Sequence, residues 1–250
     1  SNLVSPFDAV SGMLAARSGA SSQLTSKGLG YKFSGANARD DYGQRRVIPG
    51  GSTTHTVAAL AVCPTTGRNV FFSQGLQSVP YPQTALSCGV AENGVAANGY
   101  ITIIDFGGSS SAPSGSATTG NIADGNIHFV LGVRNGVASN TKIYVDGVDK
   151  TFATSGDSSA VNNSSQYLSV GNDANYSGTD RGSNGGVLLV FAWNRALTPP
   201  EVAWISANPW QLFAPQTQRI WVPAAAAGVP TLSSISAGSL TSSSAVLTIN

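Results

Sequence analysis

The residues best suited to bind a ligand lie in one polar loop late in the sequence. This loop brings together carboxylates, carboxamides, a phenol and a guanidinium, at Asn172, Asp173, Asn175, Tyr176, Asp180 and Arg181. Such groups can hydrogen-bond the hydroxyls of a sugar, and the carboxylates of Asp173 and Asp180 are oxygen ligands of the kind that Ca²⁺ accepts. The alternative is a solvated loop in which Asn and Asp side chains form local turns. The loop is therefore the candidate carbohydrate-binding site, and calcium is the one cofactor to consider.

Residues that could perform catalysis are scarce elsewhere. His55 begins an apolar run, and His128 falls on the polar-side register of residues 127–134, together with Val130 and Arg134. Neither histidine lies in a serine-elbow or HExxH pattern, so we expect structural or surface roles for both. We predict no catalytic residue.

The two cysteines, Cys63 and Cys88, carry no CxxC or zinc-binding pattern. If successive strands form a meander, these residues lie two strands apart, about 9–10 Å at the usual strand spacing. That separation is too great for a disulfide. Free thiols are therefore expected, with a disulfide as the alternative.

The elements that must position these residues are short strands separated by polar, Gly-rich breaks, a pattern typical of a β-sandwich. The predicted strands are 31–34, 55–62, 69–74, 84–91, 99–106, 127–134, 142–146, 166–171 and 186–193. The last of these is apolar on both faces, so we expect it to lie centrally and to be covered on both sides.

Residues 127–150 predict a β-hairpin. Ile127, Phe129, Leu131 and Val133 alternate on one face, and Ile143 and Val145 repeat the pattern before the sequence YVDG. Asp and Gly are turn formers, so Asp146 is expected to end a strand rather than to act in catalysis.

One short helix is predicted after Leu197. Thr198 and Glu201 have the spacing of a capping box, and Leu197 and Val202 that of a hydrophobic staple. Pro209 ends the helix. The aromatic residues that follow, Trp204, Trp210, Phe213 and Trp221, are expected to pin the helix and the return segment to the sandwich; an aromatic platform for sugars is the alternative.

Composition limits the classes of partner. The net charge is +1 and only 10% of residues are charged, which argues against nucleic-acid binding and suits a surface packed into an assembly. No apolar run approaches the roughly 18 residues that a membrane span requires, so no membrane insertion is expected. The Ala-rich stretch 223–229 predicts a linker. Residues 230–250 resemble the start of an immunoglobulin-like or fibronectin type III-like module; the alternative is a segment that contacts another subunit of an assembly.

Three segments in order resemble the laminin-G-like, concanavalin-A-like jelly rolls. They are GLGYKFSGANARDDYG, IHFVLGVRNG with TKIYVDGVDK, and QYLSVGND with GGVLLVFAWNRALTPPEV. The resemblance implies an all-β fold with two antiparallel sheets and one short C-terminal helix, spanning 28–222 after an N-terminal arm of 1–27. Jelly-roll glucanases carry an E-x-D-x-E strand, whereas this chain has only Glu92 and Glu201 and no acid in 186–193. A non-enzymatic protein is therefore expected.

The tail ANPWQLFAPQTQRIW is similar to the end of such domains in structural proteins of tailed bacteriophages. This resemblance implies a structural or adhesive virion protein, tail-associated or a capsid decoration, assembled in the host cytoplasm. Its expected partners are other virion proteins, further copies of itself and host-surface glycans. The alternatives are a secreted or surface bacterial carbohydrate-binding module, which would be extracellular, and an atypical glycosidase.

Overall fold

The structure is a computed structural model, and we describe residues 16–18, 20–33, 39–44, 46–63, 69–75, 83–89, 100–105, 115–122, 124–156, 167–171 and 186–213. The chain divides into two units, Ser1–Leu212 and Phe213–Asn250. The fold described below belongs to the first unit. The predicted linker 223–229 and the second module 230–250 lie outside the described residues, as does Trp221.

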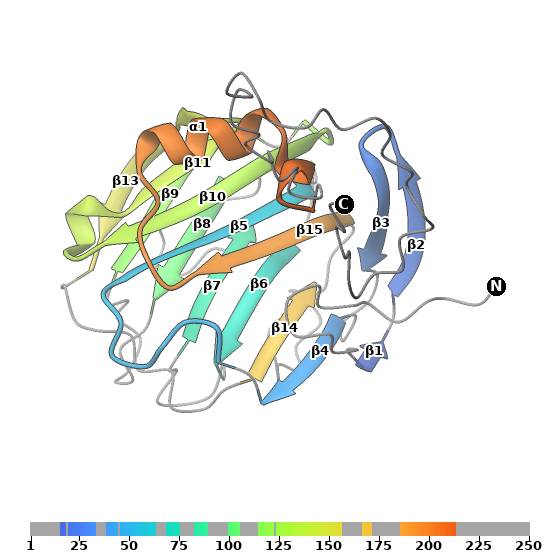
Figure 1. Ribbon diagram of the computed structural model, residues 1–250, viewed down its shortest axis with the longest axis horizontal. Helices are drawn as coiled ribbons and strands as arrows, with labels where there is room; N and C mark the ends of the chain where they lie inside the picture. Colours follow the sequence, from blue (N-terminus) through green and yellow to red (C-terminus); the bar gives the residue numbers. More distant parts are fainter. Residues whose placement is uncertain are drawn as a thin grey trace, which may run out of the picture. The chain divides into compact units, whose positions relative to one another are not determined.

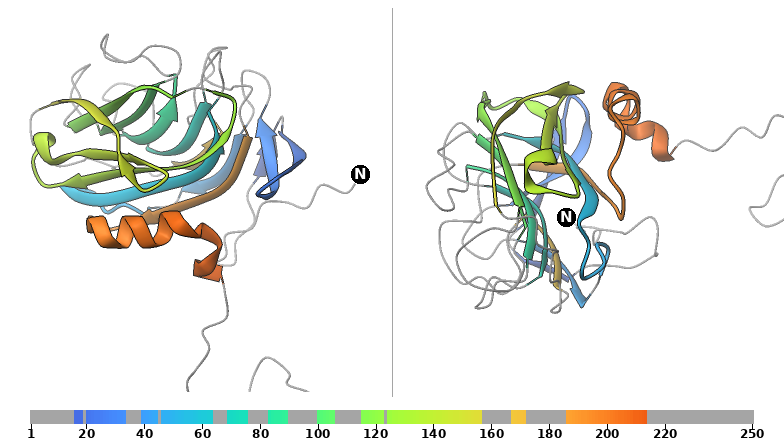
Figure 2. Two further views of the ribbon diagram at one scale, coloured as in Figure 1. Left: turned by 90° about the horizontal axis from the view of Figure 1, so that it is seen from above. Right: turned by 90° about the vertical axis from the view of Figure 1, so that its left-hand side faces the viewer.

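The described strands form two antiparallel sheets stacked as a jelly-roll sandwich (Figures 1 and 2). The eight-stranded sheet has the order β1-β4-β14-β6-β7-β8-β9-β13, and the seven-stranded sheet the order β12-β11-β10-β5-β15-β3-β2. The elements are β1 (Ala16–Ser18), β2 (Ala20–Thr25), β3 (Gly28–Phe33), β4 (Arg39–Gln44), β5 (Thr54–Val62), β6 (Asn69–Gly75), β7 (Gln83–Cys88), β8 (Tyr100–Asp105), β9 (Gly115–Asn121), β10 (Ile127–Asn135), η1 (Ala138–Asn140), β11 (Lys142–Val145), β12 (Val148–Asp149), β13 (Thr151–Ser155), β14 (Tyr167–Gly171), β15 (Gly186–Trp193), α1 (Pro199–Ala207) and η2 (Pro209–Phe213).

The predicted fold class is confirmed, and each predicted strand has a counterpart within a few residues. As expected from its apolar character on both faces, β15 lies inside its sheet, between β5 and β3. The sandwich begins earlier than residue 28, because β1 and β2 fall in the segment assigned to an arm. All six residues of β2 pair with β3, from Ala20↔Phe33 to Thr25↔Gly28.

The seven-stranded sheet is covered on both faces, and this corrects the prediction for the hairpin. Phe129, Leu131 and Val133 do not face the other sheet: they pack outward with Val202 and Ile205 of α1. Val130, Ile143 and Val145 point inward, into the core between the sheets. The helix lies along the outer side of this sheet (Figure 2). The apolar alternation of β10 therefore marks a helix-covered face, and its supposed polar face contributes to the main core.

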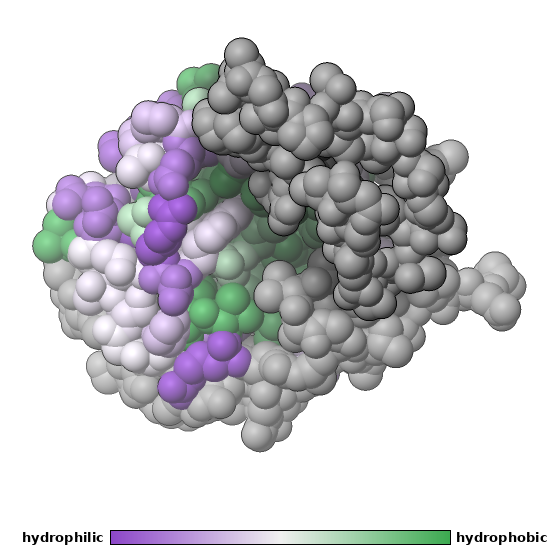
Figure 3. Space-filling view, in the orientation of Figure 1, coloured by the Kyte–Doolittle hydropathy of each residue, from purple (hydrophilic) through white to green (hydrophobic). Residues whose placement is uncertain are grey.

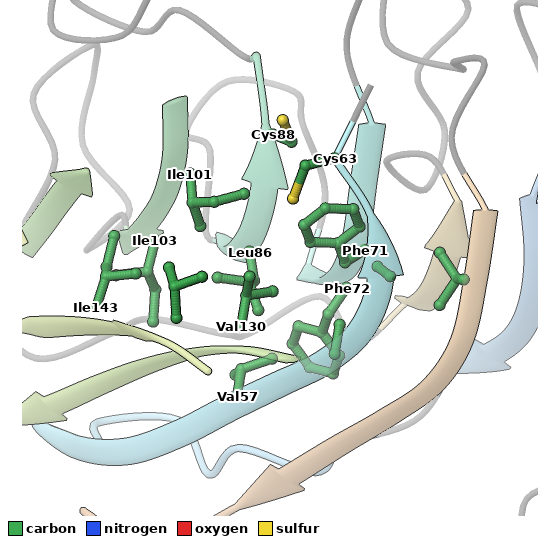
Figure 4. Close-up of a cluster of buried hydrophobic side chains, with 14 of the residues drawn as sticks. Val57, Cys63, Phe71, Phe72, Leu86, Cys88, Ile101, Ile103, Val130 and Ile143 are labelled. Atoms are coloured by element: carbon green, nitrogen blue, oxygen red, sulfur yellow. The ribbon is translucent and has the colours of Figure 1, made fainter. Parts of the chain in front are cut away.

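The inward face of β10 is shaped by a close approach of the two sheets. A Cβ atom at Gly132 would clash with Cδ1 of Ile103, on β8 of the opposing sheet, and would lie 2.7 Å from its Cβ. Real carbon atoms do not approach so closely, so a residue without a side chain is required at this position. Ile103, Ile143 and Val130 fill the space around it (Figure 4).

The turn at the end of the hairpin forms as predicted. Val145 pairs with Val148 across a two-residue loop in which Asp146 and Gly147 have φ angles of +50° and +83°. Positive φ at both positions is the signature of a type I′ turn, which matches the twist of the flanking strands. Asp146 is therefore a turn residue, as its sequence context indicates.

Helix α1 also begins as predicted. The Thr198 backbone N–H donates to Glu201 Oε2 at 2.8 Å, and the Thr198 hydroxyl donates to the same oxygen at 2.9 Å. Leu197 and Val202 are both buried. The prediction for the aromatic residues is wrong at Trp204, which leaves 58% of its surface exposed. The helix is anchored through Val202 and Ile205 instead.

The two cysteines are free thiols in the structure, but they do not lie two strands apart in one sheet, as the sequence predicted. Cys63 follows β5 in one sheet and Cys88 ends β7 in the other, so they meet across the core (Figure 4). A jelly roll passes the chain between its sheets, whereas the meander assumed from the sequence keeps successive strands in one sheet.

Candidate functional site

The loop selected from the sequence lies outside the described residues. This applies to Asn172, Asp173, Asn175, Tyr176, Asp180 and Arg181, so their roles in binding sugar or calcium stay predictions. Within the described ranges, no three His, Cys, Asp or Glu side chains converge as metal ligands would.

The described residues contain another candidate, a groove of about 280 Å³ where the end of α1 meets the outer face of the seven-stranded sheet. Leu60, Ile127 and Phe129 supply apolar lining from β5 and β10. Polar groups come from Lys27, Asp146, Ser206 and Asn208, and Trp210 supplies an aromatic ring. On this side of the molecule, several hydrophobic residues gather beside a row of hydrophilic residues (Figure 3).

Local hydrogen bonds fix the position of Trp210. Asn208, the C-cap of α1, accepts the Trp210 backbone N–H on Oδ1 at 3.2 Å. The Gln211 side chain donates to the Trp204 carbonyl at 2.7 Å and so ties η2 back to the helix. Trp210 is 39% exposed. Its ring is thus held by a short ordered segment while part of it remains open to a ligand.

Asp146 joins the groove to the start of β10. Its Oδ1 accepts the Phe129 backbone N–H at 2.9 Å, and its Oδ2 lies 2.6 Å from His128 Nδ1. The other ring nitrogen of His128, Nε2, lies 3.1 Å from Asp124 Oδ1. These bonds hold the Asp146 carboxylate at the edge of the groove.

The charges in this cluster favour a protonated histidine. Partial burial lowers the pKa of His128, but the hydrogen bonds to Asp146 and Asp124, with the charges of both carboxylates, outweigh that effect and raise it. Hydrogen bonds from the side chain and backbone of Asn126 lower the pKa of Asp124 to about 2. Only the imidazolium form has a proton to donate on each nitrogen, so both carboxylates select that form.

The other histidine, His55, belongs to a buried ionic cluster. His55 Nε2 lies 3.1 Å from Asp105 Oδ1, and Arg134 Nη1 lies 3.2 Å from Asp105 Oδ2, with all three side chains fully buried. His55 and Arg134 are cross-strand neighbours on β5 and β10, whereas Asp105 comes from β8 in the opposing sheet. The cluster joins the sheets, so the structural role expected for His55 is observed.

Glu201 is committed to structure. Its carboxylate accepts two bonds from Arg195, at 2.9 and 2.7 Å, in addition to those from Thr198. The Arg195 side-chain bond, with those from Thr198, lowers the pKa of Glu201 to about 2. A general acid for glycoside hydrolysis needs a raised pKa, whereas the pKa of Glu201 is lowered.

The comparisons with known proteins identify the family. A family model described as the concanavalin A-like lectin/glucanases superfamily matches residues 49–203, more than half of the chain. The chain belongs to this superfamily. No curated protein matches the chain significantly.

Several solved structures are similar to this chain at low sequence identity. A botulinum neurotoxin serotype D binding domain matches with a TM-score of 0.54 and 14% identity, covering 80% of this chain and 47% of that one. Domain 4 of a GH43 extracellular arabinanase from Geobacillus stearothermophilus, in complex with arabinotriose, matches with a TM-score of 0.50 and 16% identity, covering 75% and 81%. A Trypanosoma rangeli sialidase matches with a TM-score of 0.45 and 15% identity, covering 77% of this chain and 29% of that one. The chain thus spans less than a third of the sialidase and about half of the toxin binding domain.

The full lining of the groove is not predicted from the sequence. An aromatic platform for sugars that includes Trp210 is one of the two sequence-based interpretations of the aromatic residues, whereas Lys27 falls in the predicted N-terminal arm. A sequence signal did exist at Asn208-Pro209-Trp210, where a helix stop is followed at once by an aromatic residue. Whether this aromatic residue lines a groove depends on which face of the sheet the helix covers. In the described part of the chain, no helix combines the length and apolar character needed to cross a bilayer.

Proposed function

We propose that this protein is a non-enzymatic, glycan-binding adhesive module, carried on the virion of a tailed bacteriophage as a tail-associated protein or capsid decoration. The groove beside α1 is the observation that carries the binding role. It combines a partly exposed aromatic ring with a carboxylate, an ammonium and a carboxamide among its lining residues. Sugars present apolar C–H faces and hydroxyl groups, so they match both parts of this surface.

The nature of the rim favours a neutral oligosaccharide. Lys27 and Asp146 bring opposite charges to the same groove, so neither an anionic nor a cationic ligand gains from a net field. An arabinanase domain with this fold is known in complex with arabinotriose, which supports a short oligosaccharide as the ligand class. The commitment of Glu201 to its cap and to Arg195 supports binding without hydrolysis.

Binding is tested by titrating neutral oligosaccharides from a glycan array against the full chain and the variant Trp210→Ala. We expect the variant to bind at least about tenfold more weakly, equivalent to about 1.4 kcal/mol. Trp204→Ala is the matched control, because Trp204 is a more exposed tryptophan outside the groove lining. Equal affinity of wild type and Trp210→Ala, with both variants folded, would show that the groove is not the site.

The virion assignment needs a separate test. Gold-labelled antibody against the chain should decorate the tail or the capsid surface of the particle in electron micrographs. Labelling confined to the surface or medium of uninfected bacteria would support the alternative, a bacterial carbohydrate-binding module. Release of reducing sugar from any polysaccharide that the protein binds would contradict the non-enzymatic role.

A further inference from the structure

The core of the sandwich holds two cysteine side chains that lie next to each other and come from opposite sheets. Cys63 and Cys88 are both fully buried in the inter-sheet cluster, and their side chains lie within hydrogen-bonding distance of each other. Figure 4 shows the pair at one end of this cluster, next to Phe71 and Ile101.

The backbone holds both cysteines in place. The Cys63 N–H donates to the Asn126 carbonyl at 3.2 Å, and the Cys63 carbonyl accepts from Gly125 N–H at 3.0 Å. Cys88 sits between Asn69 of β6 and Ile101 of β8 in the ladder of the other sheet. Because both residues belong to hydrogen-bonded frames, the meeting of the thiols is a property of the fold.

A buried polar side chain accompanies them. Asn69 is the ladder partner of Cys88, and neither its Oδ1 nor its Nδ2 has a hydrogen-bond partner. This end of the core therefore carries a buried amide whose unmade hydrogen bonds cost free energy. A covalent link at this point would add to the contacts that join the two sheets here.

We propose that Cys63 and Cys88 form a disulfide that joins the two sheets when the chain folds in the presence of a disulfide oxidant such as oxidised glutathione. One cysteine thiolate attacks the glutathione disulfide and releases one glutathione. The second cysteine thiolate then attacks the mixed disulfide and releases the other. The two cysteine thiols lose two protons and two electrons in total, and one oxidised glutathione becomes two reduced ones.

The burial of the pair determines when the reaction can occur. The hydrogen bond between the thiols, together with burial, raises the pKa of Cys63 far above its ordinary range. Thiolate is the reactive form, so the folded reduced protein resists oxidation and the disulfide forms before the core closes. A chain folded in a reducing cytosol keeps both thiols, and a chain folded in an oxidising compartment acquires the link.

The test compares two refolding conditions for the full chain. Reduced, unfolded protein is refolded either with reduced glutathione alone or with a mixture of oxidised and reduced glutathione. The oxidised product should lose two hydrogens by mass, resist thiol labelling after denaturation and give a Cys63–Cys88 peptide. Its Tm should rise by roughly 5–10 °C, and the rise should vanish after reduction.

Cys63→Ala and Cys88→Ala are the controls. Each should show the same Tm in both refolding conditions, because one thiol cannot close the link. If both thiols of the wild-type chain still react after oxidative refolding, or carry only glutathione, the proposal is wrong. A disulfide between two molecules in place of the internal one would overturn it equally.

Discussion

Asp105 offers the sharpest test of how the two sheets are held together. Its carboxylate is fully buried and contacts His55 and Arg134, both from the opposite sheet, at 3.1 and 3.2 Å. Burial alone would raise the pKa of Asp105, but the charge and hydrogen bond of His55 and the charge of Arg134 outweigh it and lower the pKa. The ionised carboxylate is therefore a stabilising part of the native state.

The variant Asp105→Asn keeps the size of the side chain and removes its charge. Arg134 then stays buried without its counter-ion, and breaking a buried pair in this way costs about 3–5 kcal/mol. That loss is a large share of the roughly 5–15 kcal/mol by which a protein of this kind is stable. Urea unfolding at pH 7 measures the difference in free energy of unfolding.

The difference should also depend on pH with a defined sign. Because the pKa of Asp105 is lowered by folding, its stabilisation is fully present above the unfolded pKa of about 3.9. It is lost as the pH falls below that value, so the curves of wild type and Asp105→Asn should converge there. Asp149→Asn is the matched control: it breaks an exposed pair with Lys142, at 3.5 Å, and should cost less than about 1 kcal/mol. A cost for Asp105→Asn no greater than that of the control would refute the reasoning.

Three further predictions follow from the packing, the histidine cluster and the C-terminal segment. Gly132→Ala should lower the free energy of unfolding by about 1–3 kcal/mol, measured by urea unfolding, because its methyl group meets Ile103. Adding Ile103→Ala should recover part of that loss. An unchanged free energy of unfolding in Gly132→Ala would contradict the close approach of the two sheets. The contribution of His128 to the stability of the folded protein is fully present below about pH 6.5 and disappears as the pH rises through its raised pKa. The Tm of wild type should therefore fall over that pH interval, whereas the Tm of His128→Gln should stay level. Parallel Tm curves for the two proteins would count against the cluster. Deletion of 224–250 should leave a folded sandwich, by circular dichroism, that no longer incorporates into its assembly; normal incorporation would exclude a role for this segment.

The groove shows why the candidate site could be predicted only in part. The helix that borders it was predictable from Thr198 to Pro209, because caps and prolines act through neighbouring backbone atoms. The lining was not, since Lys27, Phe129 and Trp210 come from segments far apart in the sequence. These residues lie together only because α1 covers the outer face of the seven-stranded sheet. The packing of Val202 and Ile205 against that face positions the helix there.

The sequence by itself determined the local elements of this protein: the alternating strands, the type I′ turn at Asp146 and the capped helix. These features depend on interactions a few residues apart, so residue type and spacing specify them. Strands such as β4 (Arg39–Gln44) and β9 (Gly115–Asn121) escaped prediction, because they are polar and their strand character comes from backbone pairing with neighbours. Only the tertiary structure decided that β10 turns Phe129 toward a helix and Arg134 into the core, and that Cys63 meets Cys88. Alternation along a strand separates its two faces, but what each face packs against is set by contacts between distant segments.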